Sequence, residues 1–325
     1  MRAAVFHGAR RISIGEQAIP AAGAGEVLLR VARTALCGSD AKLWLKGAAH
    51  TPGHEIAGIV EQPGHALHGR RSLVYIPVHC APHSDPCASC SNGDTHLCLS
   101  ESTLVGWNRP GGYAEYLPVP EQCLLPVPDD VDDRLAPLLL DTIGTSGHGL
   151  RLAQALVPDG DVLVTGAGPI GLGAVIAAAD MGYRDVWVAD PRAARVELAA
   201  AFGARPHPVG DRSRRFHLVV ESSGAHAARN QALEIVRPKG VVLLLGENDD
   251  PWTIEETKPV RRKDFYMLRS FYFPKGDYAA NLERLRRHRD RYARLVDLEF
   301  GIEELPQRFA EFADGRLLKP LLAFD

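Results

Sequence analysis

The chain has 325 residues, of which 46% are hydrophobic and 24% charged, and its formal net charge is −3. This composition is typical of a globular protein of about two domains, and the small charge argues against binding to nucleic acid or to an anionic membrane. No apolar run approaches the roughly 18 residues needed to span a bilayer. The first residues become polar too soon for a signal peptide, which predicts a cytoplasmic protein.

The first 130 residues are rich in glycine and proline and contain short β-type runs. Three of these runs begin at Glu26, Glu55 and Ser72, and turn-forming residues separate them. The pattern predicts a twisted, mostly antiparallel β domain with long loops.

From about residue 138 the chain alternates between short apolar strands and helical segments. The expected strands lie at 161–165, 185–189, 217–221 and 240–245. The expected helices lie at 169–181, 192–202 and 225–236, followed by amphipathic helices at 278–288 and 303–313 and a last strand at 320–324. This alternation indicates βαβ units and a parallel sheet.

A cluster of cysteines predicts a closed metal site. Four of the six cysteines in the chain fall within 19 residues, namely Cys80, Cys87, Cys90 and Cys98. The C-x2-C spacing in this cluster lets two thiolates hold one metal, and a structural zinc takes four such ligands. In a cytoplasmic protein, clustered cysteines are metal ligands more often than disulfides. The remaining Cys123 is expected to pack as a small apolar residue.

A second, open metal site is predicted from Cys37, His54 and Asp141. One thiolate, one imidazole and one carboxylate can hold a zinc ion and leave the fourth position to water or an alcohol, which is the arrangement of a catalytic zinc. We therefore expect two zinc ions per chain, one catalytic and one structural.

A glycine-rich turn predicts a dinucleotide site. Its residues Gly166, Gly168, Pro169, Ile170 and Gly171 fit the pattern G-x-G-x-x-G, directly after a predicted strand and at the start of a helix. The first glycine permits the tight turn, the second lets a pyrophosphate approach the backbone, and the third lets helix and strand pack closely. The helix N-terminus offers N–H groups and partial positive charge to the phosphates.

The following strands supply further cofactor-binding candidates. Asp190 ends the next strand, 19 residues after Gly171, and a carboxylate there accepts hydrogen bonds from the ribose hydroxyls and repels a 2′-phosphate. NAD is therefore favoured over NADP, although Arg195 would be a partner for such a phosphate. Ser222 and Gly246 follow later strands, at the carboxyl edge of the sheet, where the nicotinamide half should sit.

These motifs occur in an order that resembles one family. The chain has Cys-Gly-Ser-Asp at 37–40, Gly-His-Glu at 53–55 and Gly-Tyr-Ala-Glu-Tyr at 112–116, together with the cysteine cluster and the glycine-rich turn. Over nearly its whole length it resembles the zinc-dependent medium-chain dehydrogenase/reductase family, in the alcohol dehydrogenase-like group.

The resemblance implies an α/β fold made of two domains. A groES-like, β-rich catalytic domain is expected at 1–137 and 276–325, and a Rossmann domain with a doubly wound parallel sheet at 138–275. NAD and substrate are expected in the cleft between them. The resemblance also implies a homodimer or homotetramer built by pairing the edges of Rossmann sheets, with the strand near 267–273 as the candidate edge.

The resemblance further assigns roles around the open site. Cys37 and His54 match zinc ligands, Asp141 stands in the position of the third ligand, and Glu55 is either in the second shell or a transient ligand that displaces water. Ser39 matches the hydroxyl that accepts the proton of the substrate. Lys42 stands where many relatives have a histidine that passes this proton on. Because lysine is a poor base near neutrality, either the protein favours its neutral form, or it binds a cofactor oxygen, or the relay bypasses it.

The cysteine cluster departs from the usual family spacing, C-x2-C-x2-C-x7-C. Cys87, Cys90 and Cys98 fit the last three positions, but the first position is held by a serine. Either Cys80 is the first ligand, with a longer loop after it, or the site uses Asp85 or His83, or it is empty. We favour Cys80.

The oxygen-bearing third ligand resembles branches of the family that act on polyols, sugars, cyclitols and amino alcohols. The expected reaction is oxidation of a polar secondary alcohol with NAD, or reduction of the matching ketone. One alternative is a zinc-free quinone or enoyl reductase on the same scaffold, against which Cys37, His54 and Asp190 argue. Another alternative is a catalytically inactive nucleotide-binding protein, against which the apparently complete ligand set argues.

Overall fold

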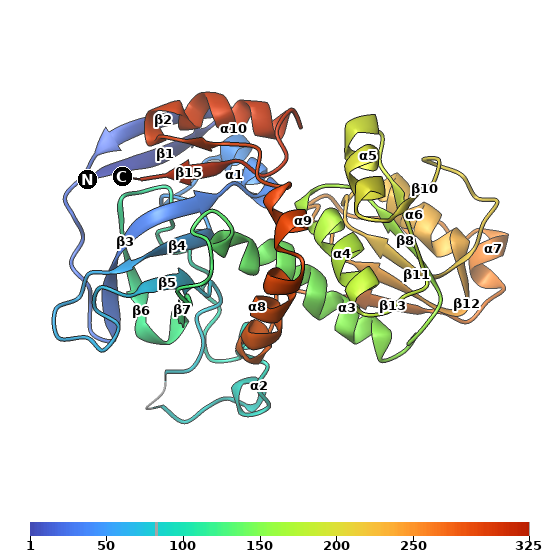
Figure 1. The fold of residues 1–325 in the computed structure, drawn as a ribbon, viewed down its shortest axis with the longest axis horizontal. Coiled ribbons are helices and arrows are strands. Elements are labelled where there is room, and N and C mark those ends of the chain that lie inside the picture. Colours follow the sequence, from blue (N-terminus) through green and yellow to red (C-terminus); the bar gives the residue numbers. More distant parts are fainter. Residues whose placement is uncertain (82–83, 325) are drawn as a thin grey trace. The chain divides into compact units, whose positions relative to one another are not determined.

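The computed structural model of the protein describes residues 1–81 and 84–324 (Figure 1). The chain divides into two compact units. Unit 1 comprises Met1–Leu140, Pro274–Tyr278 and Tyr292–Asp325, and unit 2 comprises Asp141–Phe273 and Ala279–Arg291. Among the described residues, no helix has both the length and the apolar character needed to cross a membrane.

Unit 1 is the predicted β-rich part. An antiparallel hairpin is formed by β1 (Arg2–Gly8) and β2 (Arg11–Glu16). A seven-stranded sheet has the order β14-β15-β3-β4-β5-β7, with β6 paired to β3. Its strands are β3 (Glu26–Ala35), β4 (Glu55–Val60), β5 (Arg71–Val74), β6 (Tyr116–Pro120), β7 (Leu124–Pro126), β14 (Glu299–Phe300) and β15 (Leu321–Ala323).

The helices of unit 1 are short, except for the last. They are α1 (Ala41–Lys46), α2 (Ala88–Ser91) and α10 (Leu305–Ala313). A core beneath the hairpin joins Phe6, Trp44, Tyr113 and Phe309. In this core the ring of Phe309 lies 5.3 Å from that of Phe6 and 5.5 Å from that of Trp44. This packing fixes α1, which begins four residues after Cys37, beyond a 3-10 turn at Gly38–Asp40.

Unit 2 is the predicted nucleotide-binding part, built on a six-stranded parallel sheet. The strand order is β10-β9-β8-β11-β12-β13, so the order reverses between β8 and β11, as in a doubly wound Rossmann sheet. The strands are β8 (Asp161–Thr165), β9 (Asp185–Ala189), β10 (Arg205–Pro206), β11 (Phe216–Glu221), β12 (Val236–Leu244) and β13 (Tyr266–Arg269). The predicted α/β fold class is confirmed.

The helices of unit 2 largely follow the predicted pattern. They are α3 (Ser146–Gln154), α4 (Pro169–Asp180), α5 (Ala193–Ala201), α6 (His226–Ile235), α7 (Lys258–Arg261) and α8 (Tyr278–Arg287), with α9 (Arg289–Ala293) running back into unit 1. Residues 279–291, which we expected in the catalytic domain, group with unit 2. There Arg284 and Arg287 of α8 lie 3.3 and 2.9 Å from the carboxylate of Asp180. The domain limits expected from the resemblance, 1–137 with 276–325 and 138–275, remain a prediction.

The sequence pattern does not predict α3 or the π-helical turn before it, Asp141–Thr145. Several glycines lower the helical propensity of this segment, but close packing requires two of them. A Cβ on Gly144 would lie 2.3 Å from the ring of Phe273, and one on Gly149 would lie 2.8 Å from the side chain of Leu245. Tertiary packing therefore overrides the local preference.

Candidate metal centres and cofactor site

The four clustered cysteines form one group around a common centre. Each offers a sulfur, and the four sulfurs all lie within 4.8 Å of one another. The sulfur of Cys98 lies 3.7 Å from that of Cys80 and 3.8 Å from that of Cys87. Tetrahedral zinc with Zn–S bonds of about 2.3 Å sets its sulfurs about 3.8 Å apart. The geometry of these donors therefore fits a zinc ion.

Backbone donors surround the same sulfurs. The N–H of Cys87 donates to the sulfur of Cys80 at 3.4 Å, and the N–H of Leu99 donates to that of Cys87 at 3.3 Å. Hydrogen bonds from the backbone of Cys90 and Leu99 lower the pKa of the Cys87 thiol to about 5. Burial raises the pKa of Cys90 to about 12. A bound divalent cation would favour the thiolate at all four positions.

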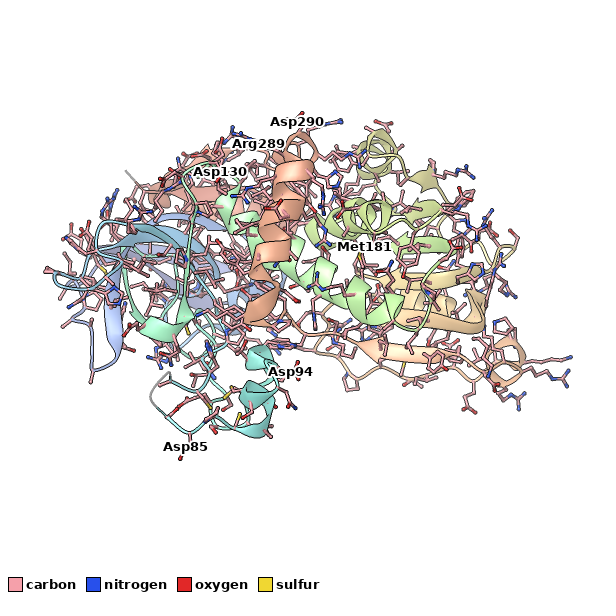
Figure 2. The ribbon with its side chains drawn as sticks, turned by 60° about the horizontal axis from the view of Figure 1, so that its bottom comes forward. Asp85, Asp94, Asp130, Met181, Arg289 and Asp290 are labelled. Atoms are coloured by element: carbon pink, nitrogen blue, oxygen red, sulfur yellow. The ribbon has the colours of Figure 1, made fainter. Side chains whose placement is uncertain are left out.

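The surroundings of the cluster support Cys80 as the fourth ligand. Asp85 is exposed and points away from the lobe that carries the sulfurs (Figure 2). The hydroxyl of Ser84 donates to the carbonyl of Ala81 at 2.9 Å. His83, the other alternative, lies outside the described residues. Cys123, by contrast, is fully buried away from the cluster, where burial raises its pKa to about 12.

The candidate ligands of the open site that belong to unit 1 lie close together. Cys37 follows β3, and His54 and Glu55 stand at the start of β4, its antiparallel neighbour. Asp141 directly follows Leu140, in the π-helical turn. Within unit 1, Cys37, His54 and Glu55 each offer one ligand atom, and these atoms lie within 4.8 Å of one another. The role of Asp141, the first residue of unit 2, as third ligand remains a prediction. One thiolate, one imidazole and carboxylate oxygens are donors that suit catalytic zinc.

A buried carboxylate orients His54. Its Nδ1 lies 3.1 Å from Oδ1 of Asp40, and both side chains are at most 2% exposed. Tyr113 donates its hydroxyl to Oδ2 of Asp40 at 2.7 Å, and burial together with this carboxylate raises the pKa of Tyr113 well above its usual value. Because Nδ1 faces Asp40, Nε2 is the nitrogen left for a metal, as in carboxylate–histidine–zinc arrangements.

Ser39 lies inside this ligand set. Its hydroxyl is 3.3 Å from the sulfur of Cys37 and 3.5 Å from Nε2 of His54. Lys42 is half-buried, and its ammonium lies over the indole of Trp107, 4.3 Å from the ring centroid. The same indole lies 5.4 Å from the ring of His54. This cation–π contact holds the lysine side chain against the indole.

Glu55 has a buried cationic partner. Lys319, which lies two residues before β15, forms an ion pair with Glu55, and the two side chains are 1% and 0% exposed. Its ammonium also donates to the carbonyl of Leu36 at 3.2 Å. A buried charge requires such pairing. The partnership holds the Glu55 carboxylate beside the ligand set.

The glycine-rich turn has the geometry that its motif predicts. Gly166 has a φ of +91°, and a Cβ on Gly171 would lie 1.8 Å from the carbonyl oxygen of Gly166. Only glycine therefore fits at either position. A Cβ on Gly168, by contrast, would meet nothing within 4 Å. This open space in front of the backbone, at the start of α4, suits an approaching pyrophosphate.

Asp190 is tied to the glycine-rich turn. Its carboxylate accepts from the N–H of Ala167 at 2.7 Å and from the N–H of Arg192 at 2.8 Å. The N-cap of α5 is Arg192, so Asp190 is not simply the helix cap. Arg195, the possible phosphate partner, is half-buried in the first turn of α5. The carboxylate is thus fixed beside the glycine-rich turn, and its contact with a ribose remains a prediction.

The two other cofactor candidates are engaged with neighbouring loops. Ser222 donates its hydroxyl to the carbonyls of Thr165 and Gly166, at 3.0 and 2.8 Å. Gly246 donates its N–H to the carbonyl of Glu221 at 2.9 Å, and its own carbonyl accepts from Arg229 at 3.0 Å. These contacts position the loops, and direct binding of cofactor by either residue remains a prediction.

Sequence reasoning missed three supporting residues. Asp40 stands inside a quoted motif without an assigned role, whereas Lys319 and Arg229 carry no motif at all. Each acts through a partner that is distant in the sequence or beneath a loop. Only the aspartate had a usable signal, namely an acidic residue close to a predicted metal ligand.

Comparisons with known proteins identify the family. Residues 23–129 match the family described as "Alcohol dehydrogenase GroES-like domain", and residues 169–287 match "Zinc-binding dehydrogenase". L-threonine 3-dehydrogenase of Chromobacterium violaceum is 33% identical over 94% of each chain, and that of Anaeromyxobacter dehalogenans is 30% identical over 94% of this chain and 92% of the relative.

Solved structures agree with this assignment. The alcohol dehydrogenase of Thermus sp. ATN1 is 27% identical, with a TM-score of 0.90 over the full length of both chains. Galactitol-1-phosphate dehydrogenase of Escherichia coli has a TM-score of 0.87 over both full chains at 24% identity, which is a likeness of fold. The chain belongs to the zinc-dependent alcohol dehydrogenase group of the medium-chain dehydrogenase/reductase family.

Membership in this family establishes the class of reaction. The protein is an NAD- and zinc-dependent oxidoreductase that acts on CH–OH groups. The predictions of family, enzyme class and cofactors are therefore confirmed.

Proposed function

We propose that the protein oxidises the secondary hydroxyl of a small amino alcohol, with L-threonine as the leading candidate, and uses NAD as the hydride acceptor. The observation that carries this proposal is the likeness to relatives named L-threonine 3-dehydrogenase, at 33% identity over 94% of the chain. The donor set of Cys37, His54 and Asp141 is consistent with it. Polyols and sugars are the second candidate, because an oxygen-bearing ligand also suits them.

The residues fit two different metal roles. Cys37, His54 and Asp141 would hold a catalytic zinc, and Cys80, Cys87, Cys90 and Cys98 would hold a structural one. The catalytic ion, when bound, supplies Lewis acidity that lowers the pKa of an alcohol in its open position. The closed set of four sulfurs leaves no such position.

Other residues around the open site orient a ligand, accept a proton or supply charge. Asp40 keeps the His54 ring oriented through Nδ1, and Tyr113 keeps Asp40 in place. Ser39, beside Cys37 and His54, accepts the proton that the substrate hydroxyl loses. Glu55, held by its ion pair with Lys319, supplies negative charge beside the ligands.

Replacing Ser39 with alanine should reduce kcat by roughly 100-fold, because a positioned proton acceptor contributes on the order of 10²–10⁴ to such rates. Steady-state kinetics of NADH formation measure the effect, and metal analysis should show the zinc content unchanged. Ser39→Thr, which keeps a hydroxyl, is the matched control and should retain most activity. Full turnover by the alanine variant would rule out the relay role.

The substrate proposal is tested by following NADH absorbance with L-threonine, 2,3-butanediol, sorbitol and 2-butanol, each with NAD and with NADP. We expect kcat/KM to be highest for L-threonine. We expect NAD to be preferred over NADP by about 10-fold or more, because the carboxylate of Asp190 would repel a 2′-phosphate. A tenfold preference corresponds to about 1.4 kcal/mol of binding free energy. A preference for sorbitol would favour the polyol alternative, and oxidation of none of them would contradict the proposal.

We further propose a homo-oligomer that forms through the edge strand β13 and works in the cytoplasm. Tyr266 and Met267 on this strand are each 46% exposed, and Phe271 just beyond it is 37% exposed. An exposed apolar edge strand is a ready template for pairing with a second chain. All six cysteines are thiols, which is consistent with a reducing compartment.

A further inference from the structure

Three loops meet at the carboxyl edge of the sheet in unit 2. They are the glycine-rich turn after β8, the 222–225 loop after β11 and the 245–248 loop after β12. The strand order places β11 between β8 and β12. In a doubly wound sheet, the half that contains β8 and β9 binds the adenosine part, and the half that begins with β11 binds the nicotinamide part.

The 222–225 and 245–248 loops touch backbone to backbone. A Cβ on Gly224 would lie 2.1 Å from the carbonyl oxygen of Glu247, and one on Gly246 would lie 2.2 Å from the nitrogen of Gly224. The side chain of Asn248 donates to the carbonyl of Gly224 at 3.0 Å. No side chain would fit at Gly224 or Gly246, where the two loops touch. The buried backbone N–H and C=O groups of these loops therefore need hydrogen-bond partners from the strands and helices that carry the loops.

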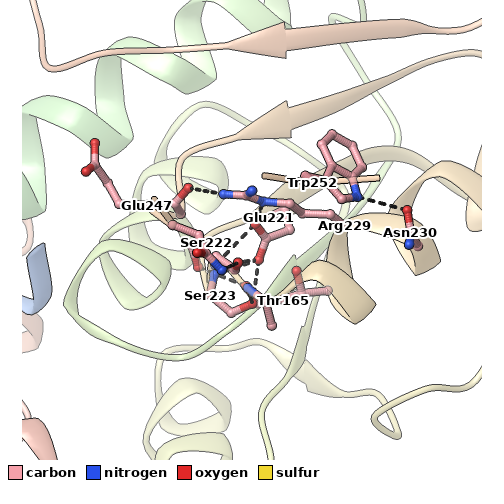
Figure 3. A network of polar contacts seen from close by, with 12 residues as sticks. Thr165, Glu221, Ser222, Ser223, Arg229, Asn230, Glu247 and Trp252 are labelled. Atoms are coloured by element: carbon pink, nitrogen blue, oxygen red, sulfur yellow. Dashed lines mark hydrogen bonds and ion pairs between the residues drawn. The ribbon is translucent and has the colours of Figure 1, made fainter. Parts of the chain in front are cut away.

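Glu221 supplies the acceptor for the first loop. It is the last residue of β11 and is fully buried. Its carboxylate accepts from the N–H and the hydroxyl of Ser223, at 2.7 and 2.5 Å, and from the N–H of Gly224 at 3.0 Å (Figure 3). Ser222 lies between Glu221 and Ser223 in the chain. Its hydroxyl donates to the backbone carbonyls of Thr165 and Gly166 and so links this loop to the glycine-rich turn.

Arg229 connects Glu221 to the second loop. It comes from α6 and is 7% exposed. Its Nε lies 3.5 Å from the carboxylate of Glu221, and its Nη2 donates to the carbonyl of Gly246 at 3.0 Å (Figure 3). Its guanidinium lies 5.7 Å from the ring of Trp252. One buried ion pair thus reaches both loops.

We propose that Glu221 and Arg229 form a positioning pair that holds these two loops in the arrangement that binds the nicotinamide half of NAD. The pair lies beneath the loops and need not touch the cofactor. This inference rests on the proposed placement of the nicotinamide half at this edge of the sheet. The adenosine half depends instead on Asp190 and the glycine-rich turn, which have their own hydrogen bonds.

The test compares binding of NADH with binding of ADP-ribose, which lacks the nicotinamide. Arg229→Met leaves a buried carboxylate without its cation, which is costly. We expect the Kd for NADH, measured by fluorescence, to rise about 30-fold, and the Kd for ADP-ribose, measured by calorimetry, to change less than about 3-fold. Arg229→Lys should restore part of the NADH affinity, because it restores the charge.

Arg269→Met is the matched control. Arg269 also donates to the carbonyl of Gly246, at 2.7 Å, but its side chain is 45% exposed and it pairs with Glu247 instead of Glu221. We expect its Kd for NADH to change less than about 3-fold, because exposed pairs contribute little. The double variant Glu221→Gln with Arg229→Met should bind NADH more tightly than Arg229→Met alone.

If Arg229→Met raises the Kd for NADH and the Kd for ADP-ribose equally, or raises neither, the positioning role is overturned. If Arg229→Met does not fold, the same comparison is made with Arg229→Lys and Glu221→Gln, and the same outcomes decide. Failure of the wild-type protein to bind NADH more tightly than ADP-ribose would instead count against the proposed placement of the nicotinamide half. Neither measurement depends on zinc or on a substrate.

Discussion

Replacing His54 with alanine is expected to abolish alcohol oxidation, with a loss of kcat/KM of more than about 1,000-fold, and to lower the zinc content from two ions per chain to one. Removing the imidazole leaves one thiolate and one carboxylate, which are too few donors for a catalytic zinc. Without the ion, no group in this site replaces its Lewis acidity. NADH formation and metal analysis of the purified variant measure the two effects.

Cys37→Ala should behave like the His54 variant, and Cys123→Ala is the matched control for it. Cys123 is buried, with its sulfur 3.9 Å from the carbonyl of Pro77 and no part in either metal group. The control variant should keep both zinc ions and nearly full activity. Substantial activity in the His54 variant, or an unchanged zinc content, would show that the open set is not the catalytic metal site.

Replacing Cys80 with alanine is expected to remove the other zinc ion and to lower Tm by about 10 °C, while the catalytic zinc stays bound. Structural zinc contributes folding free energy directly, and a loss of a few kcal/mol moves Tm by this order in a chain of this size. Activity at low temperature should fall by less than about 3-fold. Differential scanning calorimetry, metal analysis and NADH formation separate these effects.

Asp85→Ala decides the identity of the fourth ligand. Asp85 is exposed, whereas Cys80 lies within the group of four sulfurs. The Asp85 variant should therefore keep two zinc ions and an unchanged Tm. Loss of zinc in this variant, with zinc retained in Cys80→Ala, would reverse the assignment.

The lobe that carries the cysteines is also held by polar contacts to the rest of unit 1. Thr95 shares a hydrogen bond of 2.9 Å with the hydroxyl of Tyr75 and accepts from the N–H of Lys275 at 3.0 Å. The ammonium of Lys275 donates to the carbonyl of Gln122 at 2.5 Å. Loss of zinc should therefore loosen the lobe before it unfolds the remainder of the unit.

The parts of the site that sequence predicts well are those that depend on local spacing. The turn from Gly166 to Gly171 needs glycine because of its own φ angle and the helix beside it. The C-x2-C pair brings two thiolates together within one turn of chain. The alternation of strands and helices after residue 138 reports the parallel sheet, because its central strands are buried on both faces.

The parts that sequence does not predict depend on partners brought together by folding. Lys319 reaches Glu55 only because β15 pairs with β3, and β3 with β4. Strand β12 begins at Val236, four residues before the expected start, because Val236 pairs with Phe216 ahead of a bulge. Neither pairing register can be read from apolar periodicity alone.

By itself, then, the sequence determined the class of enzyme and the glycine-rich turn, and it predicted the two sets of candidate metal ligands from residue type and motif. Only the tertiary structure decided what supports them. It paired Asp40 with His54 and Tyr113, Lys319 with Glu55, and Arg229 with Glu221. Buried charges and imidazoles need a partner of the right chemistry, and that partner is chosen by the fold rather than by proximity in the chain.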